Sequence, residues 1–313
     1  MSEFKTVGAL TIEASTPLCL LQDAGRFGVR HLGVTQGGAA DWVSMSWANK
    51  LLGNALDAAV IEITLGGLSL LAEQDCCLSL AGADLGAMLG ERPLAPWRSF
   101  FIRKGERLTF SQPVLGARAY LAAPGGFDAP QVLGSCASVG REELGGLDGM
   151  GKALAKGDRL SYPGSSFLLH ALQDRQIPDL EDNSPLDVVL GAQIGQFSGS
   201  SLFDAFNSEW TLDSRADRMG IRLLGPELVY QGQPMISEGI PLGAIQVPPD
   251  GQPIVLLNDR QTIGGYPRLG ALTPLSLARL AQRLPGSTLR LKPVMQTVAH
   301  QRQMDYLRVL QTV

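Results

Sequence analysis

Short apolar or alternating runs, each bounded by glycine or proline, dominate the hydrophobic pattern of this 313-residue chain. Glycine occurs 37 times and proline 19 times, so few uninterrupted stretches are long enough for a helix. Short runs of this kind are typical of strands. The pattern therefore predicts a mainly β, barrel-like and mostly antiparallel fold with a few short helices. The expected strands are 18–21, 60–65, 76–80, 100–102, 107–110, 119–122, 254–257 and 289–291.

Three segments show helical rather than strand spacing of their apolar residues. Two of them begin after a residue whose side chain can cap a helix N-terminus, Asp41 and Thr273. Glycine or proline stands at the expected end of each of these two helices. The expected helices are 42–52, 274–284 and 301–311.

A ten-residue pattern occurs twice in the chain. Residues 25–34 and 217–226 match at five of ten positions, and two of the matches are arginine. We interpret this recurrence as a duplication, so two halves with the same fold are expected. The acidic, proline-containing stretch 172–186 is the most linker-like part of the chain. A boundary there gives domains at 1–178 and 179–313, the second carrying the C-terminal helix.

Composition and charge exclude several classes of protein. Hydrophobic residues make up 45% of the chain and charged residues 18%, which excludes a disordered chain. The formal net charge of −4 gives no general attraction for phosphate backbones, so no nucleic-acid partner is expected. Neither a signal sequence nor a membrane-spanning apolar stretch is recognisable, so a cytoplasmic location without membrane attachment is expected.

The common metal and nucleophile motifs are missing from the sequence. The three histidines are far apart and the four cysteines form no C-x-x-C pair, so we expect no metal site and reduced, buried thiols. No G-x-S-x-G nucleophile motif occurs. A hydrolase built from this chain would have to use carboxylates, amides and arginines.

Such residues gather where the apolar strand 254–257 runs into four polar positions. Strand alternation would place Asp259 and Gln261 on one face. A carboxylate beside an amide can accept an N–H and donate to a C=O, which is what the edge of an amide or urea offers. A strand end that is simply solvated by polar residues explains the pattern equally well.

Similar groups follow the strand 18–21 and recur in the second half. Asp23 and Arg26 stand in the first segment, and Asp217 and Arg218 in the second. These pairs favour an anionic or amide ligand, but Arg and Asp side chains also commonly pair to fix loops. Both interpretations stay open on the sequence alone.

Several ordered motifs together resemble the biotin-dependent carboxyltransferase, or allophanate hydrolase subunit 2, family. The resemblance covers nearly the whole chain and is carried by residues 21–26, 49–54, 62–64, 217–220, 237–239, 245–251 and 259–267. It implies a cyclophilin-like β-barrel that is present twice. It also implies that a chain of this size is one subunit of an ATP-dependent 5-oxoprolinase, which opens 5-oxo-L-proline to L-glutamate together with its subunits A and B.

The resemblance and the polar segments together give a set of expected site residues. The carbonyl of a lactam is a poor electrophile, so ATP, shared with the partner subunits and accompanied by Mg²⁺, would activate it. The expected catalytic residues are Asp259, Gln261, Asp23 and Asp217. The expected substrate- or phosphate-binding residues are Arg26, Arg218, Asn49, Glu238, Gln246 and Tyr266.

Two other functions are compatible with the same resemblance. The chain could move a carboxyl group from carboxybiotin to urea or a related amide, in which case another chain must bring the biotin, because the Ala-Met-Lys-Met biotinylation sequence is missing. Alternatively, it could be the regulatory partner of a histidine-kinase inhibitor.

Overall fold

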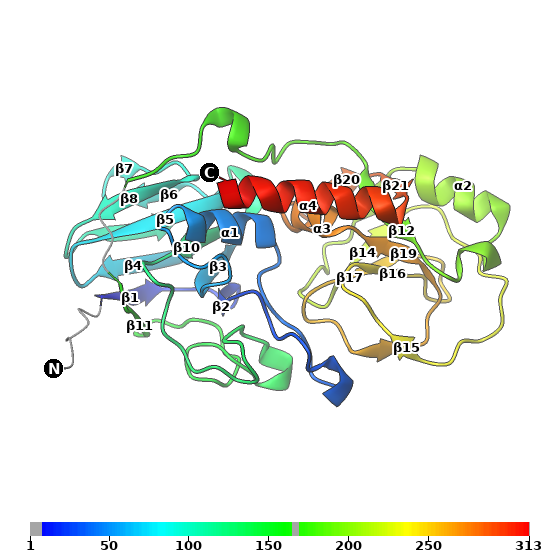
Figure 1. Ribbon diagram of the computed structural model, residues 1–313, viewed down its shortest axis with the longest axis horizontal. Helices are drawn as coiled ribbons and strands as arrows, with labels where there is room; N and C mark the ends of the chain where they lie inside the picture. Colours follow the sequence, from blue (N-terminus) through cyan, green and yellow to red (C-terminus); the bar gives the residue numbers. More distant parts are fainter. Residues whose placement is uncertain (1–7, 165–168, 313) are drawn as a thin grey trace. The chain divides into compact units, whose positions relative to one another are not determined.

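The computed structural model describes residues 8–164 and 169–312 and confirms the prediction of a mainly β fold. Each of the eight runs expected as strands contributes to a strand of the structure. The chain divides into two compact units (Figure 1). Unit 1 comprises the residues up to Phe27 and Gly37–Glu181, and unit 2 comprises Gly28–Gln36 and the chain from Asp182 onward.

Unit 1 is built from two antiparallel sheets that enclose one hydrophobic core, to which both sheets contribute side chains. The first sheet has the order β11 (Arg159–Tyr162), β1 (Gly8–Ala14), β4 (Leu68–Ala72), β9 (Arg107–Phe110), β6 (Ala87–Leu89) and β7 (Arg92–Pro93). The second has the order β2 (Cys19–Gln22), β3 (Val60–Thr64), β10 (Leu115–Ala122), β5 (Cys76–Asp84) and β8 (Arg98–Ile102).

The helix α1 (Trp42–Lys50) packs on β5 and β10 of unit 1. Asp41 caps it as predicted, because the Asp41 carboxylate accepts hydrogen bonds from the backbone N–H of Ser44 at 3.0 Å and from its hydroxyl at 2.5 Å. Unit 1 also contains the short 3₁₀ helices η2 (Gly140–Glu142) and η3 (Asp174–Gln176). All four cysteines of the chain are free and buried in the structure, and all of them lie in this unit.

Unit 2 is built around an eight-stranded sheet that curls into a nearly closed barrel. Its two edge strands, β20 and β21, follow one another in the chain with only Arg290 between them, so the sheet must bend until its edges approach the same segment. The order is β20 (Thr288–Leu289), β13 (Trp210–Leu212), β14 (Gly220–Leu224), β17 (Ile254–Leu256), β16 (Ala244–Gln246), β19 (Arg268–Leu272), β12 (Leu186–Leu190) and β21 (Leu291–Val294). A separate two-stranded antiparallel sheet pairs β15 (Glu238–Gly239) with β18 (Ile263–Gly264), two strands that are separated in the chain by β16 and β17.

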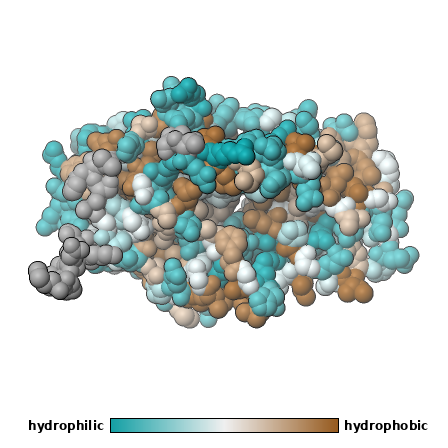
Figure 2. All heavy atoms as spheres, viewed as in Figure 1, coloured by the Kyte–Doolittle hydropathy of each residue, from teal (hydrophilic) through white to brown (hydrophobic). Residues whose placement is uncertain are grey.

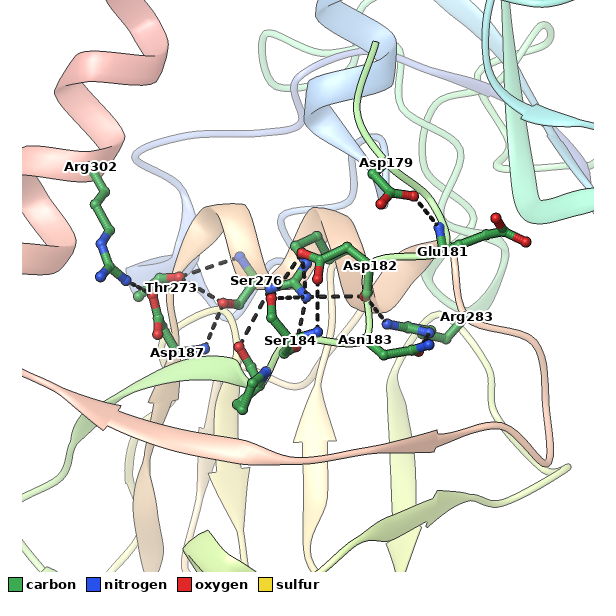
Figure 3. Close-up of polar contacts among 12 residues, drawn as sticks. Asp179, Glu181, Asp182, Asn183, Ser184, Asp187, Thr273, Ser276, Arg283 and Arg302 are labelled. Atoms are coloured by element: carbon green, nitrogen blue, oxygen red, sulfur yellow. Dashed lines mark hydrogen bonds and ion pairs between the residues drawn. The ribbon is translucent and has the colours of Figure 1, made fainter. Parts of the chain in front are cut away.

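The helix α3 (Pro274–Ala281) packs against β12 of unit 2, and its N-terminus is held by a small hydrogen-bond network. The Thr273 hydroxyl accepts from the backbone N–H of Ser276, and the Ser276 hydroxyl accepts from the backbone N–H of Asp187 at 2.8 Å (Figure 3). Arg302 pairs with the Asp187 carboxylate, so the start of β12, the start of α3 and the last helix are tied together.

Unit 2 also contains α2 (Gly199–Asn207), α4 (Gln296–Thr312), and the 3₁₀ helices η1 (Arg30–Leu32) and η4 (Ile194–Gln196). Hydrophilic residues cover much of α4 in Figure 2. Within the part of the chain that the structure describes, no helix combines the length and the apolar character needed to span a bilayer.

The three predicted helices are confirmed, with different bounds. The first and second end earlier than expected, and the third begins at Gln296. Helix α2 is not among the predicted helices, because its glycine and serines resemble a loop. The two segments of the ten-residue repeat adopt different conformations, since residues 30–32 form η1 whereas the matching 222–224 lie in β14. Residues 28–34 of the first segment also belong to unit 2, as does the whole second segment, so the repeat does not mark equivalent positions in the two units.

Gly82, in the middle of β5, provides a test of the unit 1 sheet. Its φ is +92°, and a Cβ there would lie 2.5 Å from the carbonyl oxygen of Arg118 on β10. We expect Gly82→Ala to lower the free energy of unfolding by roughly 4 kcal/mol, because backbone strain and a backbone clash combine.

The matched control is Gly105→Ala, which has a φ of +80° but no atom within 4 Å of the added Cβ. It should cost only about 1–2 kcal/mol. Urea denaturation followed by tryptophan fluorescence measures both variants. Equal losses of unfolding free energy in the two variants would show that the close contact between β5 and β10 at Gly82 adds nothing to the cost of the substitution.

Candidate functional site

The carboxylate of Asp259 is engaged by Arg218 in unit 2. Arg218 donates from Nε to one carboxylate oxygen at 3.0 Å and from Nη2 to the other at 3.1 Å. The backbone N–H of Asp259 also donates to the carbonyl of Arg218 at 2.9 Å. The ion pair is therefore bidentate. Because both side chains are largely buried, solvent screens it little. The sequence placed both residues at the site, and the structure brings them into contact.

The neighbouring Arg260 is buried, and it hydrogen-bonds to the main chain of the loop that carries Asp259. Its guanidinium donates to the carbonyls of Ile240 and Leu257 at 3.1 and 3.2 Å. Arg30 donates to the carbonyls of Ile240 and Gln261 at 2.9 and 3.1 Å. Burial, and secondarily the nearby charge of Arg30, lower the pKa of Arg260 to about 9. The loop that carries Asp259 and Gln261 is therefore fixed by hydrogen bonds from two guanidinium groups to main-chain carbonyls.

In unit 1 the carboxylate of Asp23 accepts four hydrogen bonds. The donors are the backbone N–H groups of Gly25 and Cys136 at 2.7 and 2.8 Å, the Ser135 hydroxyl at 2.6 Å, and the Cys136 thiol at 3.3 Å. Burial, followed by the charge of Asp23, raises the pKa of the Cys136 thiol. Cys136 is therefore a protonated donor and not a nucleophile.

Asp23 also lies in the wall of a pocket of about 430 Å³ that belongs to unit 1. The exposed ring of Phe27 and the buried ring of Phe127 contribute to the same pocket, together with the polar side chains of Asp57 and Gln131. A second pocket of the described residues lies in unit 2. Of the four predicted catalytic residues, Asp23 lines the first of these two pockets, and none of the four lines the second.

Arg26, Asn49 and Asp217 have structural partners instead. Arg26 is fully buried and donates to three carbonyls of the loop 132–137, including that of Ala137 at 2.8 Å. Asn49 closes the end of α1 by donating to the carbonyl of Ala58 at 2.8 Å. Asp217 is exposed and accepts from two backbone N–H groups in the turn before β14. Each of the three side chains therefore makes structural hydrogen bonds within its own unit.

Glu238 and Gln246 come together in unit 2 with two residues that the sequence did not single out, Arg268 and Gln193. Arg268 donates to Glu238 at 2.5 Å, and the Gln193 amide donates to the same carboxylate oxygen at 3.3 Å. Gln246 is the register partner of Arg268 across β16 and β19. The position of Arg268 directly after the segment 259–267 was the available signal for it.

Tyr266 is half-exposed and lies in the wall of the second pocket, of about 490 Å³, in unit 2. That pocket is mainly apolar, with Met235, Pro248 and Pro249 among its lining residues. Within the described ranges, no three His, Cys, Asp or Glu side chains are grouped so as to hold a metal ion.

The comparisons with known proteins agree on one family. Residues 32–293 match the family described as carboxyltransferase domain, subdomain A and B. The chain is 36% identical to the C subunit of 5-oxoprolinase from Haemophilus influenzae, covering 88% of this chain and 87% of that protein. It is 37% identical to the C subunit of 5-oxoprolinase from Escherichia coli, covering 84% of each.

A solved structure of the Kluyveromyces lactis urea carboxylase is also similar. It superposes with a TM-score of 0.90 at 26% identity, covering 96% of this chain and 29% of that one. The chain thus corresponds to nearly all of two bacterial subunits and to under a third of the larger urea-acting enzyme.

The Arg218–Asp259 pair can be tested by removing one charge. We expect Asp259→Asn to lower the free energy of unfolding by about 3 kcal/mol, because the largely buried Arg218 loses its counter-charge. The control Glu209→Gln breaks an ion pair with Arg290 in which both side chains are more than half exposed, and should cost less than about 1 kcal/mol. Chemical denaturation measures both variants, and similar losses would show that the Arg218 pair is no more than a surface contact.

Proposed function

The chain belongs to the family of carboxyltransferase domains with subdomains A and B, and from this premise we propose that it is the C subunit of an ATP-dependent 5-oxoprolinase. In this proposal it acts with subunits A and B to cleave 5-oxo-L-proline to L-glutamate. The observation that carries the proposal is the match along almost the whole length of two proteins named as the C subunit of 5-oxoprolinase. Similarity to the urea-acting enzymes covers only a small part of those proteins.

The reaction needs activation of a lactam carbonyl. In the proposed chemistry the lactam oxygen accepts the γ-phosphoryl group of ATP and ADP leaves. Water adds to the activated carbon, and the ring C–N bond breaks as the nitrogen takes up a proton, which gives γ-glutamyl phosphate. A second water hydrolyses this acyl phosphate to L-glutamate and phosphate. We assign the binding of ATP, and of any accompanying Mg²⁺, largely to the partner subunits. This assignment is supported by Arg26 and Arg218, which donate to main-chain carbonyls and to Asp259 respectively.

The carboxylates of Asp23 and Asp259 are proposed as positioning groups. Both oxygens of each carboxylate accept hydrogen bonds from neighbouring side chains or backbone, so neither carboxylate is arranged to accept a proton from substrate. Asp23 fixes a loop at the pocket of unit 1, and Asp259 fixes the loop that carries Gln261.

A second candidate function is transfer of a carboxyl group to urea or a related amide. The close superposition on the urea carboxylase structure supports it. Urea and 5-oxoproline share one planar H–N–C=O edge, so the same barrel could serve either substrate. For this second function, a biotin-bearing partner chain is required.

Reconstitution with subunits A and B tests the proposal. We expect the purified complex to hydrolyse ATP in a 5-oxo-L-proline-dependent manner and to release L-glutamate, and omission of this chain should abolish glutamate formation. ATP hydrolysis by coupled assay and glutamate by amino-acid analysis are the measurements. Stimulation by urea together with a biotinyl carrier, and not by 5-oxo-L-proline, would replace the first function by the second.

A further inference from the structure

The outer face of the barrel in unit 2 carries a polar cluster next to the two-stranded β15–β18 sheet. Gln246 lies between Ile245 and Val247, which both belong to the barrel core, so its side chain points away from that core. Arg268 also points outward, because it donates to the Glu238 carboxylate and to the carbonyl of Gly239 on β15. Gln246 and Arg268 lie on the side where Ile240, Ala244 and Leu256 form a separate small apolar cluster.

Two side-chain atoms of this cluster are buried without a hydrogen-bond partner among the described residues: Gln246 Nε2 and Gln193 Oε1. Gln246 is 2% exposed and Gln193 is 8% exposed, so both side chains are shielded from bulk solvent. The orientation of the Gln193 amide follows from its Nε2, which donates to the Glu238 carboxylate. One unsatisfied donor and one unsatisfied acceptor therefore remain in the cluster.

A chain of contacts places these two amides in one neighbourhood. The amide of Gln193 and the guanidinium of Arg268 both reach the same oxygen of Glu238. Glu238 is the register partner of Gly264 in the β15–β18 ladder, and a Cβ on Gly264 would lie 2.9 Å from Gln246 Nε2. The absence of a side chain at Gly264 leaves the Gln246 amide its space.

We infer that Gln246 and Gln193 bind the H–N–C=O edge of a lactam, a step that rests on the proposed function and names its substrate-binding residues. Gln246 Nε2 donates to the lactam oxygen, and Gln193 Oε1 accepts from the lactam N–H. This arrangement replaces the expected pair of Asp259 and Gln261, because the Asp259 carboxylate is engaged by Arg218.

Access to the two amides requires the β15–β18 ladder to open. This ladder has only two residue pairs, and the Glu238 side chain is about half exposed. The contacts of Glu238 with Arg268 and Gln193 hold β15 at the cluster. A ligand that pairs with Gln193 and Gln246 therefore enters as the two strands separate.

The variant Gln246→Met separates ligand binding from packing. Methionine has a similar volume without polar atoms, so replacing an unpaired buried amide should leave the melting temperature unchanged or raise it. In the reconstituted complex we expect a KM for 5-oxo-L-proline raised roughly tenfold, since one buried hydrogen bond to substrate is lost. Binding of 2-pyrrolidinone, measured by saturation-transfer NMR, should weaken by the same factor, whereas L-proline, which lacks the lactam carbonyl, should bind neither form.

The control is Gln252→Met in the same unit, where the glutamine side chain hydrogen-bonds to the backbone of Gly225 in a turn. It should lower the melting temperature slightly and leave KM and 2-pyrrolidinone binding unchanged. If Gln246→Met lowers the melting temperature and leaves KM and binding as in the wild type, Gln246 is structural and the inference is wrong, while the proposed function stands. If the complex turns over no 5-oxo-L-proline yet binds 2-pyrrolidinone in a Gln246-dependent way, the proposed function fails and the amide site remains.

Discussion

Buried guanidinium groups that donate to main-chain carbonyls hold the irregular loops of both units. A loop outside the sheets leaves carbonyls without partners, and each one buried in that state costs about 1–3 kcal/mol. A guanidinium has five N–H donors in one plane, so a single side chain can satisfy several carbonyls at once. Arg26 does this for the loop 132–137 of unit 1, and Arg260 does it for Ile240 and Leu257 in unit 2. The polar sites around Asp23 and Asp259 depend on loops fixed in this way.

The need of buried polar groups for hydrogen-bond partners also decides which polar side chains remain available for a ligand. Asp23 and Asp259 are held by hydrogen bonds within their own unit, so their carboxylates are part of the scaffold. The amides of Gln193 and Gln246 are different, because each keeps an atom without a partner among the described residues in a buried position. These two amides of the second unit therefore offer a donor and an acceptor for a neutral, planar group.

The sequence predicts local structure here much better than it predicts contacts. Alternating apolar runs identify strands, and Asp41 and Thr273 identify helix starts, because these signals depend on neighbours within a few residues. Asp23 meets Cys136 across 113 positions, and no spacing rule reports such a pair. The family motifs directed attention to Glu238 and Gln246, but Gln193 stands in an unremarkable turn and becomes visible only through its contact with Glu238. The ten-residue repeat also does not predict local structure, because the matching residues Arg30 and Arg222 lie in a 3₁₀ helix and in a strand, respectively.

The fold alone does not decide between a lactam and urea, because a shared barrel supports different reactions in different proteins. Both substrates present an N–H beside a C=O, so a donor and an acceptor in one buried cluster would serve either, and the rest of the site must select between them. An amide that is buried with an unpaired atom destabilises a chain by about 1–3 kcal/mol relative to an apolar residue of the same size. Gln193 and Gln246 are two such amides in unit 2, connected through Glu238 and Gly264. They are readily explained as groups that find their partners when a small amide enters.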